Sequence, residues 1–169
     1  MISGNKVNLR PFDNRDLDFL YKWNNDSEYV GRFESFKSRS REELIRVNSV
    51  NGLTWYIIET KQGMRLGQLV AYKKGDVSIN IGYRVIPDAR NQGFCSDAVK
   101  TFVDYAFKNE GILKVTAETH PDNFASRKIL EKAGFKKIGF DEKPVEINGV
   151  LVNGVLYEVS LMDWQNNQI

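Results

Sequence analysis

The hydrophobic pattern changes its period near residue 87, and this change limits the folds that the chain can adopt. Three runs between residues 54 and 86, TWYIIET, RLGQLVAYK and VSINIGYRVI, alternate apolar and polar side chains and are separated by glycine-containing turns. Such a pattern predicts three antiparallel strands joined by tight turns. From Gly93 onward the apolar residues recur at helical spacing, which predicts one long helix. A single short connection therefore joins an antiparallel meander to a helix.

The flanking segments add further helices and strands. VNLRPF predicts a short strand that ends near Pro11, and DNRDLDFLYKWNND predicts a helix. A second helix starts at SREE, where Ser40 and Glu43 have the spacing of a capping box. After the long helix, ILKVTAET predicts a strand, NFASRKILEKAGF a helix that Gly134 closes, and VEINGVLVNGVLYEVSLMDW two strands around Asn-Gly turns. This order predicts an α+β layer fold, and we expect one domain over residues 1–169.

The composition excludes several classes of function. The 24 basic and 22 acidic residues give a formal net charge of +2, too small and too scattered to indicate a nucleic-acid partner. No apolar run is long enough to span a membrane and MISGNKVNLR lacks the apolar core of a secretory signal, so we expect a soluble cytoplasmic protein without a membrane partner. Cys95 is the single cysteine and His120 the single histidine, so we expect no disulfide and no metal. His120, in ETHPDN, is interpreted as a turn residue rather than a catalytic base.

The connection RNQGF has two interpretations. A basic residue and a glycine directly before a helix can hold a phosphate, because the free amide hydrogens and the helix dipole favour an anion there. Gly93 would let that anion approach the backbone closely. The same stretch can also be a simple turn between packed elements. It lacks the Gly-Lys-Ser/Thr of a P-loop and the three glycines of a dinucleotide fingerprint, so the local pattern does not decide between the two.

Two stretches together resemble the signature motifs of the GCN5-related N-acetyltransferases, the GNAT superfamily. VIPDARNQGFCSDAVKTFVDYAF is similar to the first motif, Gln/Arg-x-x-Gly-x-Gly/Ala, whose three defined places hold Arg90, Gly93 and Cys95. NFASRKILEKAGF is similar to the second motif through Asn123, Ser126, Leu130, Gly134 and Phe135. KWNND and YEVSLMDW also resemble the branch of the ribosomal-protein N-terminal acetyltransferases (RimJ/RimL-like), so the resemblance covers nearly the whole chain.

The resemblance implies a fold and a cosubstrate. The GNAT fold is an α+β fold with a central mixed, mostly antiparallel twisted sheet of about seven strands flanked by about four helices. Acetyl-CoA would place its pyrophosphate on the amides of residues 91–96 and its pantetheine arm along the strand that ends in YRVI, which splays from the next strand. An amide near Val85 or Ile86 would polarise the thioester carbonyl. The implied cofactor-binding residues are Val85, Ile86, Arg90, Asn91, Gln92, Gly93, Phe94, Cys95, Ser96 and Asn123.

The implied chemistry is transfer of the acetyl group to a primary amine by direct attack in a ternary complex. The amine must lose a proton, and Glu118 stands where several relatives carry a glutamate base, although it is alternatively a solvated strand residue. The tyrosine with which many members protonate the leaving thiolate is replaced by Leu130. Ser126 is the substitute candidate for this acid, although its simpler role is to cap or pack the helix start. Tyr83 and Tyr157 are further candidates for the same role.

Cys95 departs from the glycine or alanine usual in the first motif. Its simpler interpretation is a tolerated small side chain. The sharper alternative is a thiol with a lowered pKa at the helix N-terminus, whose modification would block CoA.

The acceptor stays open at this point. A protein N-terminal α-amine is the first candidate, and a polyamine, aminoglycoside or amino sugar is the alternative. A polyamine site needs converging carboxylates, and Asp26, Glu28 and Glu34 lie in the segment 25–39, which has no clear period. A non-catalytic CoA-binding regulatory module and a plain interaction domain are hypotheses of other classes. VEINGVLVNG is a candidate edge for a homodimer.

Overall fold

The structure, a computed structural model, describes residues 1–167. The strands are β1 (Ile2–Ser3), β2 (Val7–Pro11), β3 (Leu53–Thr60), β4 (Arg65–Lys73), β5 (Ser78–Val85), β6 (Lys114–Thr119), β7 (Lys136–Phe140), β8 (Val145–Ile147), β9 (Val150–Val152) and β10 (Val155–Ser160). The helices are α1 (Leu17–Asn24), α2 (Ser27–Val30), α3 (Arg41–Asn48), α4 (Phe94–Asn109), α5 (Phe124–Lys132) and α6 (Leu161–Asn166), with 3-10 turns at Asn14–Asp16 and Pro87–Ala89. In this part of the chain β8 and β9 form a hairpin, and the other strands form one eight-stranded sheet in the order β1-β2-β3-β4-β5-β6-β10-β7.

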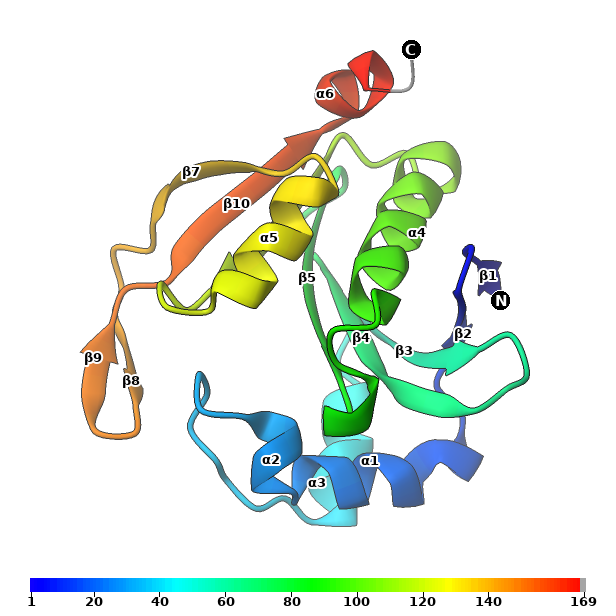
Figure 1. Ribbon diagram of the computed structural model, residues 1–169, viewed down its shortest axis with the longest axis vertical. Coiled ribbons are helices and arrows are strands. Elements are labelled where there is room, and N and C mark those ends of the chain that lie inside the picture. Colours follow the sequence, from blue (N-terminus) through cyan, green and yellow to red (C-terminus); the bar gives the residue numbers. More distant parts are fainter. Residues whose placement is uncertain (168–169) are drawn as a thin grey trace.

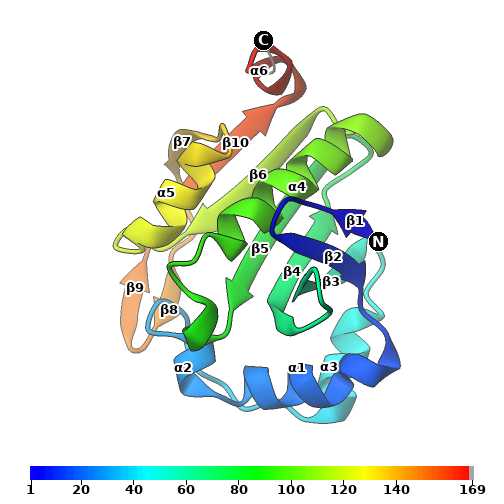
Figure 2. The same ribbon diagram turned by 45° about the vertical axis from the view of Figure 1, so that its right-hand side comes forward.

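The predicted α+β fold with a mixed, mostly antiparallel sheet is confirmed. Across the described sheet β5 and β6 are the parallel pair, and the other neighbours are antiparallel. Side chains alternate between the faces of a strand, so Ile57 packs with the core of α1–α3 and Ile58 with the core under α4. The two groups of helices therefore cover opposite faces of the sheet, and Figures 1 and 2 show them apart from each other.

The helix boundaries follow local capping interactions. The Ser40 side chain accepts a hydrogen bond from the Glu43 amide, and the Glu43 carboxylate accepts one from the Ser40 amide, which is the predicted capping box of α3. Gly134, with a φ of 88°, follows α5 as predicted. Within residues 1–167, none of the helices is long and apolar enough to cross a membrane.

Several elements were not predicted from the sequence. β1 and α2 have only 2 and 4 residues, too few for a periodic pattern. β7, KKIGF, is mostly exposed at the edge of the sheet and therefore lacks apolar alternation. LMDW was expected to end a strand, but it begins α6 because the Ser160 side chain caps this segment by accepting from the Asp163 amide at 3.1 Å.

The tail forms three strands instead of the two that the sequence predicted. β8 and β9 pair across Asn148 and Gly149, whose φ values of 51° and 83° suit a two-residue hairpin turn. Asn153 and Gly154, expected to be a second turn of this kind, instead connect the hairpin to β10, which lies between β6 and β7 in the main sheet. The homodimer edge expected from this segment stays a prediction.

Asp16 ties the start of α1 to the sheet. Its fully buried carboxylate accepts hydrogen bonds from Arg10 of β2 at 2.8 and 2.9 Å and from Arg65 of β4 at 2.8 Å. Burial alone would raise the pKa of Asp16, but hydrogen bonds from Arg10, the Asp13 amide and Arg65 outweigh burial and hold this pKa below its usual value. One carboxylate therefore fixes the α1–α3 group on its face of the sheet.

We expect Asp16→Asn to lower the free energy of unfolding at neutral pH by about 3 kcal/mol, because it leaves two arginines without their shared buried carboxylate. The native pKa is lowered, so this stabilisation is present above the unfolded-state pKa of about 4 and is lost as the pH falls through the native pKa. Urea unfolding measures the change. Asp18→Asn is the matched control, because Asp18 is 82% exposed in its ion pair with Arg41 and should cost at most about 1 kcal/mol. Equal losses in the two variants would contradict this role of Asp16.

Candidate active site

β5 and β6 pair over only the first part of their length. Their parallel register ends at Ile81 and Ala117, although β5 continues to Val85 and β6 to Thr119. Beyond this point the two strands leave a gap in the sheet, and their divergence can be followed in Figure 2. The splay that the resemblance implied is therefore present.

The gap exposes backbone groups of β5. The Ile86 amide donates to the Leu66 carbonyl at 2.8 Å, so residue 86 bonds toward β4. Hydrogen-bonding direction alternates along an antiparallel pair, so the N–H and C=O groups of Tyr83 and Val85 point the other way, into the gap. Two amides were expected to polarise a carbonyl. The Ile86 amide already donates a hydrogen bond within the sheet, whereas the Val85 amide faces the gap.

The turn between β5 and α4 gathers amide hydrogens at one helix end. Asn91 and Gly93 have φ values of 59° and 81°, and Gly93 is the N-cap of α4. The Asp97 amide donates to the Gly93 carbonyl at 3.0 Å, so the amides of residues 94–96 precede the first bond within the helix. They stand at the positive end of a helix of 16 residues, which is the geometry that an anion site requires.

The side chains of Arg90 and Gln92 are engaged by the protein itself. The Arg90 guanidinium donates to the carbonyls of Glu28 and Tyr29 in α2, and the Gln92 side chain donates to the Asp88 carbonyl. Arg90 therefore fixes α2 beside the turn. Because the side chains of Arg90 and Gln92 are engaged in these bonds, we expect the two residues to contact a ligand through their backbone amides.

Lys6 is a cation at this site that the sequence interpretation missed. The Asp97 carboxylate accepts hydrogen bonds from the amides of residues 5–7 at 2.7 to 3.2 Å, which fixes the β1–β2 loop against α4. Lys6 Nζ donates to the Gln92 carbonyl at 3.0 Å, and a Cβ placed on Gly93 would lie 3.3 Å from it. No local spacing relates residue 6 to residue 92, so the folded chain alone reveals this charge.

Cys95 lies in the first turn of α4 and packs against the core under that helix. Burial raises the pKa of its thiol to about 12, and the Arg90 guanidinium opposes part of the shift. The thiol is therefore protonated at neutral pH. This agrees with the interpretation of a small packed side chain and contradicts the alternative of a reactive thiol with a lowered pKa.

Ser126 and Tyr83 form a hydrogen-bonded pair, with 3.0 Å between their hydroxyl oxygens. Asn123 is the N-cap of α5, and its side-chain oxygen accepts from the Ser126 amide at 3.1 Å. Burial raises the pKa of Tyr83, and the hydrogen bond with Ser126 opposes part of this shift. The other tyrosine candidate, Tyr157, has its hydroxyl engaged by two side chains of α5. Tyr83 and Ser126 are thus the hydroxyl pair that remains for proton transfer.

Glu118 lies near the end of β6 and faces away from α4 and α5. Its neighbour Ala117 belongs to the core under α4, so alternation along the strand turns Glu118 to the opposite face. A Cβ on Gly154 would lie 1.9 Å from Glu118 Oε1, so this carboxylate packs where only glycine fits. Partial burial raises the pKa of Glu118, Asp141 raises it further by repulsion, and Lys74 opposes both. A solvent-accessible carboxylate with a raised pKa is a suitable general base.

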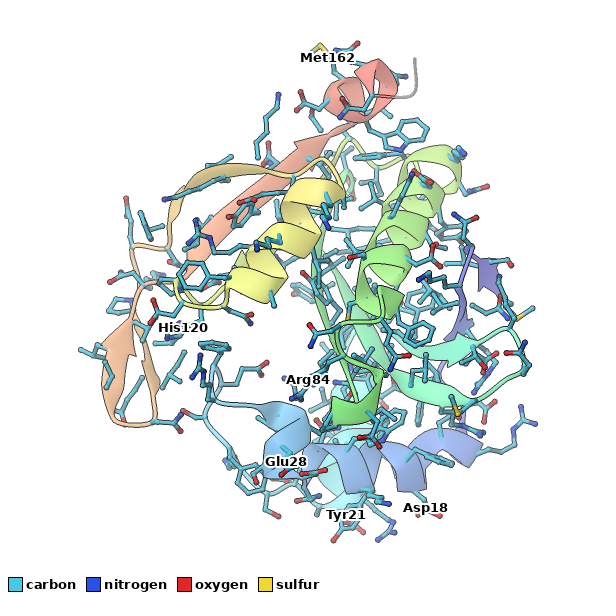
Figure 3. The ribbon with its side chains drawn as sticks, viewed as in Figure 1. Asp18, Tyr21, Glu28, Arg84, His120 and Met162 are labelled. Carbon is cyan, nitrogen blue, oxygen red and sulfur yellow. The ribbon has the colours of Figure 1, made fainter. Side chains whose placement is uncertain are left out.

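Arg84 shares this face with Glu118. Asn80 of β5 donates to Thr116 of β6 at 3.0 Å, and Arg84 and Glu118 follow these two residues by four and two positions. Arg84 also forms an ion pair with Glu34 of the α2–α3 loop, residues 31–40. Figure 3 shows Arg84 above α2 in this view. The gap therefore has the amide turn on one face of the sheet and a carboxylate and a guanidinium on the other.

Two hollows open beside the α2–α3 loop. The hairpin hollow, about 750 Å³, lies between this loop, the β6–α5 turn and the β8–β9 hairpin. The Arg84 hollow, about 260 Å³, lies between the same loop, α1, α3 and strands β3 to β5. Ser35 fastens the loop to the hairpin by donating to the Glu146 carbonyl at 3.1 Å. His120 lines the hairpin hollow as the turn residue that was predicted, since its Nδ1 accepts from the Asp122 amide at 3.1 Å (Figure 3).

The arrangement suits transfer between two substrates that are bound at once. A phosphate-bearing arm can lie along β5 with its anion at α4, and a nucleophile can reach the gap from the opposite face past Glu118. Over residues 1–167, no cluster of three or more His, Cys, Asp or Glu side chains gathers as a metal site.

Comparisons with known proteins identify the family. A family profile described as an acetyltransferase (GNAT) domain matches residues 6–136, more than half of the chain. The uncharacterised N-acetyltransferase YnaD of Bacillus subtilis is 22% identical over 167 residues, which cover 96% of this chain and 98% of that protein. The probable N-acetyltransferase YjcK of the same organism is 41% identical over 70 residues, which cover 41% of this chain and 39% of that protein.

Solved structures share the fold. An acetyltransferase (GNAT family) from Bacillus anthracis has a TM-score of 0.83 at 21% identity, covering 95% of this chain and 98% of that one. Spermidine N-acetyltransferase from Vibrio cholerae, solved with CoA and spermine, has a TM-score of 0.84 at 19% identity, covering 95% and 99%. These likenesses establish the fold. The profile match over more than half of the chain shows that it belongs to the GNAT family of acetyltransferases.

Proposed function

We propose that this enzyme moves the acetyl group of acetyl-CoA to a primary amine by direct attack in a ternary complex. The observation that carries the proposal is the gap between β5 and β6, with the amide turn before α4 on one face and Glu118 on the other. The coenzyme pyrophosphate binds the amides of residues 91–96 beside Lys6, and the pantetheine arm pairs with Tyr83 and Val85 as an added strand. These groups fit the coenzyme. The amide hydrogens and the Lys6 cation suit its pyrophosphate, and the unpaired edge of β5 suits its pantetheine arm.

The Val85 amide donates a hydrogen bond to the thioester carbonyl oxygen. Negative charge develops on that oxygen as the amine attacks, and a fixed amide hydrogen stabilises the charge without having to reorganise. The acetyl carbon then lies inside the gap, so the amine approaches it from the face that carries Glu118.

Glu118 accepts the proton that the attacking amine must lose, and its raised pKa makes it a stronger base than an ordinary glutamate. The C–N bond forms as the C–S bond breaks. The leaving thiolate takes a proton that solvent supplies through the hydrogen-bonded hydroxyls of Tyr83 and Ser126. This hydroxyl pair stands in for the tyrosine that Leu130 replaces.

The proposed acceptor is the α-amine of a protein or peptide N-terminus. An α-amine has a pKa of about 7.7 to 8.0, so roughly a tenth of it is neutral at pH 7, whereas an alkyl amine with a pKa near 10.4 is less than about one thousandth neutral. A single carboxylate base is therefore better matched to the α-amine.

A polyamine is the alternative acceptor. Spermidine is the substrate named for the Vibrio cholerae enzyme. Two of the three carboxylates expected for a polyamine site are engaged by the protein itself, because Asp26 caps α2 by accepting from the Glu28 amide and Glu34 pairs with Arg84. This arrangement supports the α-amine over the polyamine.

Glu118→Gln tests the proposal. It should lower kcat by about a hundredfold, because the amide cannot accept the amine proton, and should leave the Kd for acetyl-CoA within about twofold, because residue 118 lies on the other face. Release of CoA from acetyl-CoA, with a peptide bearing a free N-terminus as acceptor, measures the rate. In the unmutated enzyme the rate should fall as the pH drops through the raised pKa of Glu118, which must be deprotonated to act.

Asp141→Asn is the matched variant, because it removes the repulsion that contributes to the raised pKa and should move this acid limb to lower pH without abolishing activity. An unchanged rate in Glu118→Gln would contradict the role of base. Binding of acetyl-CoA without turnover of any amine would instead favour a non-catalytic CoA-binding module.

Lys6→Gln should raise the Kd for acetyl-CoA about tenfold at low salt, because it removes a cation beside the proposed phosphate site. The difference should shrink as ionic strength rises, since screening weakens the attraction. Calorimetric titration measures both constants. Lys143→Gln, a change at an exposed lysine of the β7–β8 loop, is the control and should bind as the unmutated protein does. Equal affinities of Lys6→Gln and the control would remove Lys6 from the site.

A further inference from the structure

The Arg84 hollow contains polar atoms that lack partners. Among residues 1–167, Trp55 Nε1 and Gln68 Oε1 are buried without a hydrogen bond, and each side chain belongs to a residue only 7% exposed. Both residues line the hollow. A buried donor without a partner is destabilising, so a ligand that accepts a hydrogen bond from the Trp55 indole would recover part of that loss, as a carboxylate can. The Gln68 oxygen needs a donor, which a carboxylate does not supply.

The charges around the hollow are mainly positive. Lys37, Arg39 and Arg84 line it, and Glu34 is the acidic residue among its described lining. The single Arg84–Glu34 ion pair leaves the other two cations without a counter-charge in the lining. A concave site with this balance attracts an anion and repels a polycation.

Within the ion pair Arg84 is the fixed partner and Glu34 the replaceable one. The Arg84 side chain is 20% exposed and its guanidinium lies 5.5 Å from the Tyr29 ring centre, whereas the Glu34 side chain is 59% exposed on the α2–α3 loop. Ion pairs with an exposed partner contribute little to stability, because solvent screens the charges. A carboxylate of a ligand can therefore take the place of Glu34 at little cost.

We propose that the Arg84 hollow binds a carboxylate of the acceptor, which displaces Glu34 from Arg84. Arg84 lines the hollow and directly precedes Val85, whose amide faces the gap, so the hollow and the gap meet at the end of β5. This inference rests on the proposed acetyl transfer and narrows its acceptor to an anionic α-amine. The carboxylate has two sources, the side chain of an acidic first residue of a peptide or the α-carboxylate of a free amino acid.

The test is calorimetric titration of the full chain, saturated with CoA, with four probes. Three are amidated tripeptides that differ only in their first residue, which is glutamate, glutamine or lysine, and the fourth is free glutamine. The glutamate peptide carries only a side-chain carboxylate and free glutamine only an α-carboxylate. The glutamine peptide carries neither, and the lysine peptide adds a cation.

At least one carboxylate probe should bind ten times more tightly than the glutamine peptide, and the lysine peptide should bind most weakly. The probe that binds identifies the source of the carboxylate. The inference is overturned if neither carboxylate probe shows this preference or if the lysine peptide binds as tightly as they do.

Two variants predict effects of opposite sign. Arg84→Gln should remove the preference for the carboxylate, whereas Glu34→Gln should tighten carboxylate binding about fivefold by removing the internal competitor. A cationic acceptor held by Glu34 would instead bind more weakly to Glu34→Gln, and that result would overturn the inference. Arg46→Gln, a change at an exposed arginine of α3 outside the lining of both hollows, is the control.

Titration of each variant with acetyl-CoA separates the two claims. If acetyl-CoA binds but the carboxylate probes do not, the anionic acceptor is wrong and acetyl transfer stands. If acetyl-CoA itself does not bind, the proposed function fails. The probes are then titrated into the coenzyme-free protein, where loss of the carboxylate preference in Arg84→Gln still tests the carboxylate site.

Discussion

The interrupted pairing of β5 and β6 is the constraint on which the rest of the site depends. Each strand is held on its outer side, because β4 pairs with β5 as far as Val85 and β10 pairs with β6 as far as Thr119. Their inner sides separate after Ile81 and Ala117, so backbone groups are left facing a gap that neither strand can close without breaking its outer ladder. A ligand that pairs with this edge satisfies those groups.

The two faces of the gap are supplied by different parts of the chain. Asp97 binds the β1–β2 loop to the first turn of α4 and so brings Lys6 to the amide turn. On the other face, Asp16 holds the α1–α3 group through arginines of two strands, and this group carries the α2–α3 loop that reaches Arg84. Charged contacts between distant segments thus position the groups on both faces of the gap.

The sequence predicted what local chemistry determines. The three-strand meander, the capping box at Ser40 and the glycine turn before α4 are set by residues next to one another, and all are present. The motifs also led to the family. Very short elements and the exposed edge strand β7 escaped prediction, because a few residues or a solvated strand carry no hydrophobic period.

Parts of the site depend on contacts that no local pattern encodes. Lys6 meets residue 92, and Tyr83 meets Ser126 across 43 positions, only after the sheet and helices have packed. Which of the Val85 and Ile86 amides faces the gap depends on which residues of β5 bond to β4. The alternation of apolar and polar side chains in the sequence does not determine this. The alternative of a lowered pKa for Cys95 is wrong, because burial raises the pKa of this thiol and Arg90 opposes only part of the shift.

The most direct test of the account is calorimetric titration of the Gly93 variants with acetyl-CoA. Gly93→Asn keeps the left-handed backbone accessible and adds no charge, whereas Gly93→Glu places a carboxylate beside the proposed pyrophosphate site. The account predicts that the unmutated protein binds, that Gly93→Asn binds within about tenfold of it, and that Gly93→Glu loses at least about a hundredfold in affinity. No binding by the unmutated protein, or equal binding by the Asn and Glu variants, would contradict the claim that this turn holds the coenzyme.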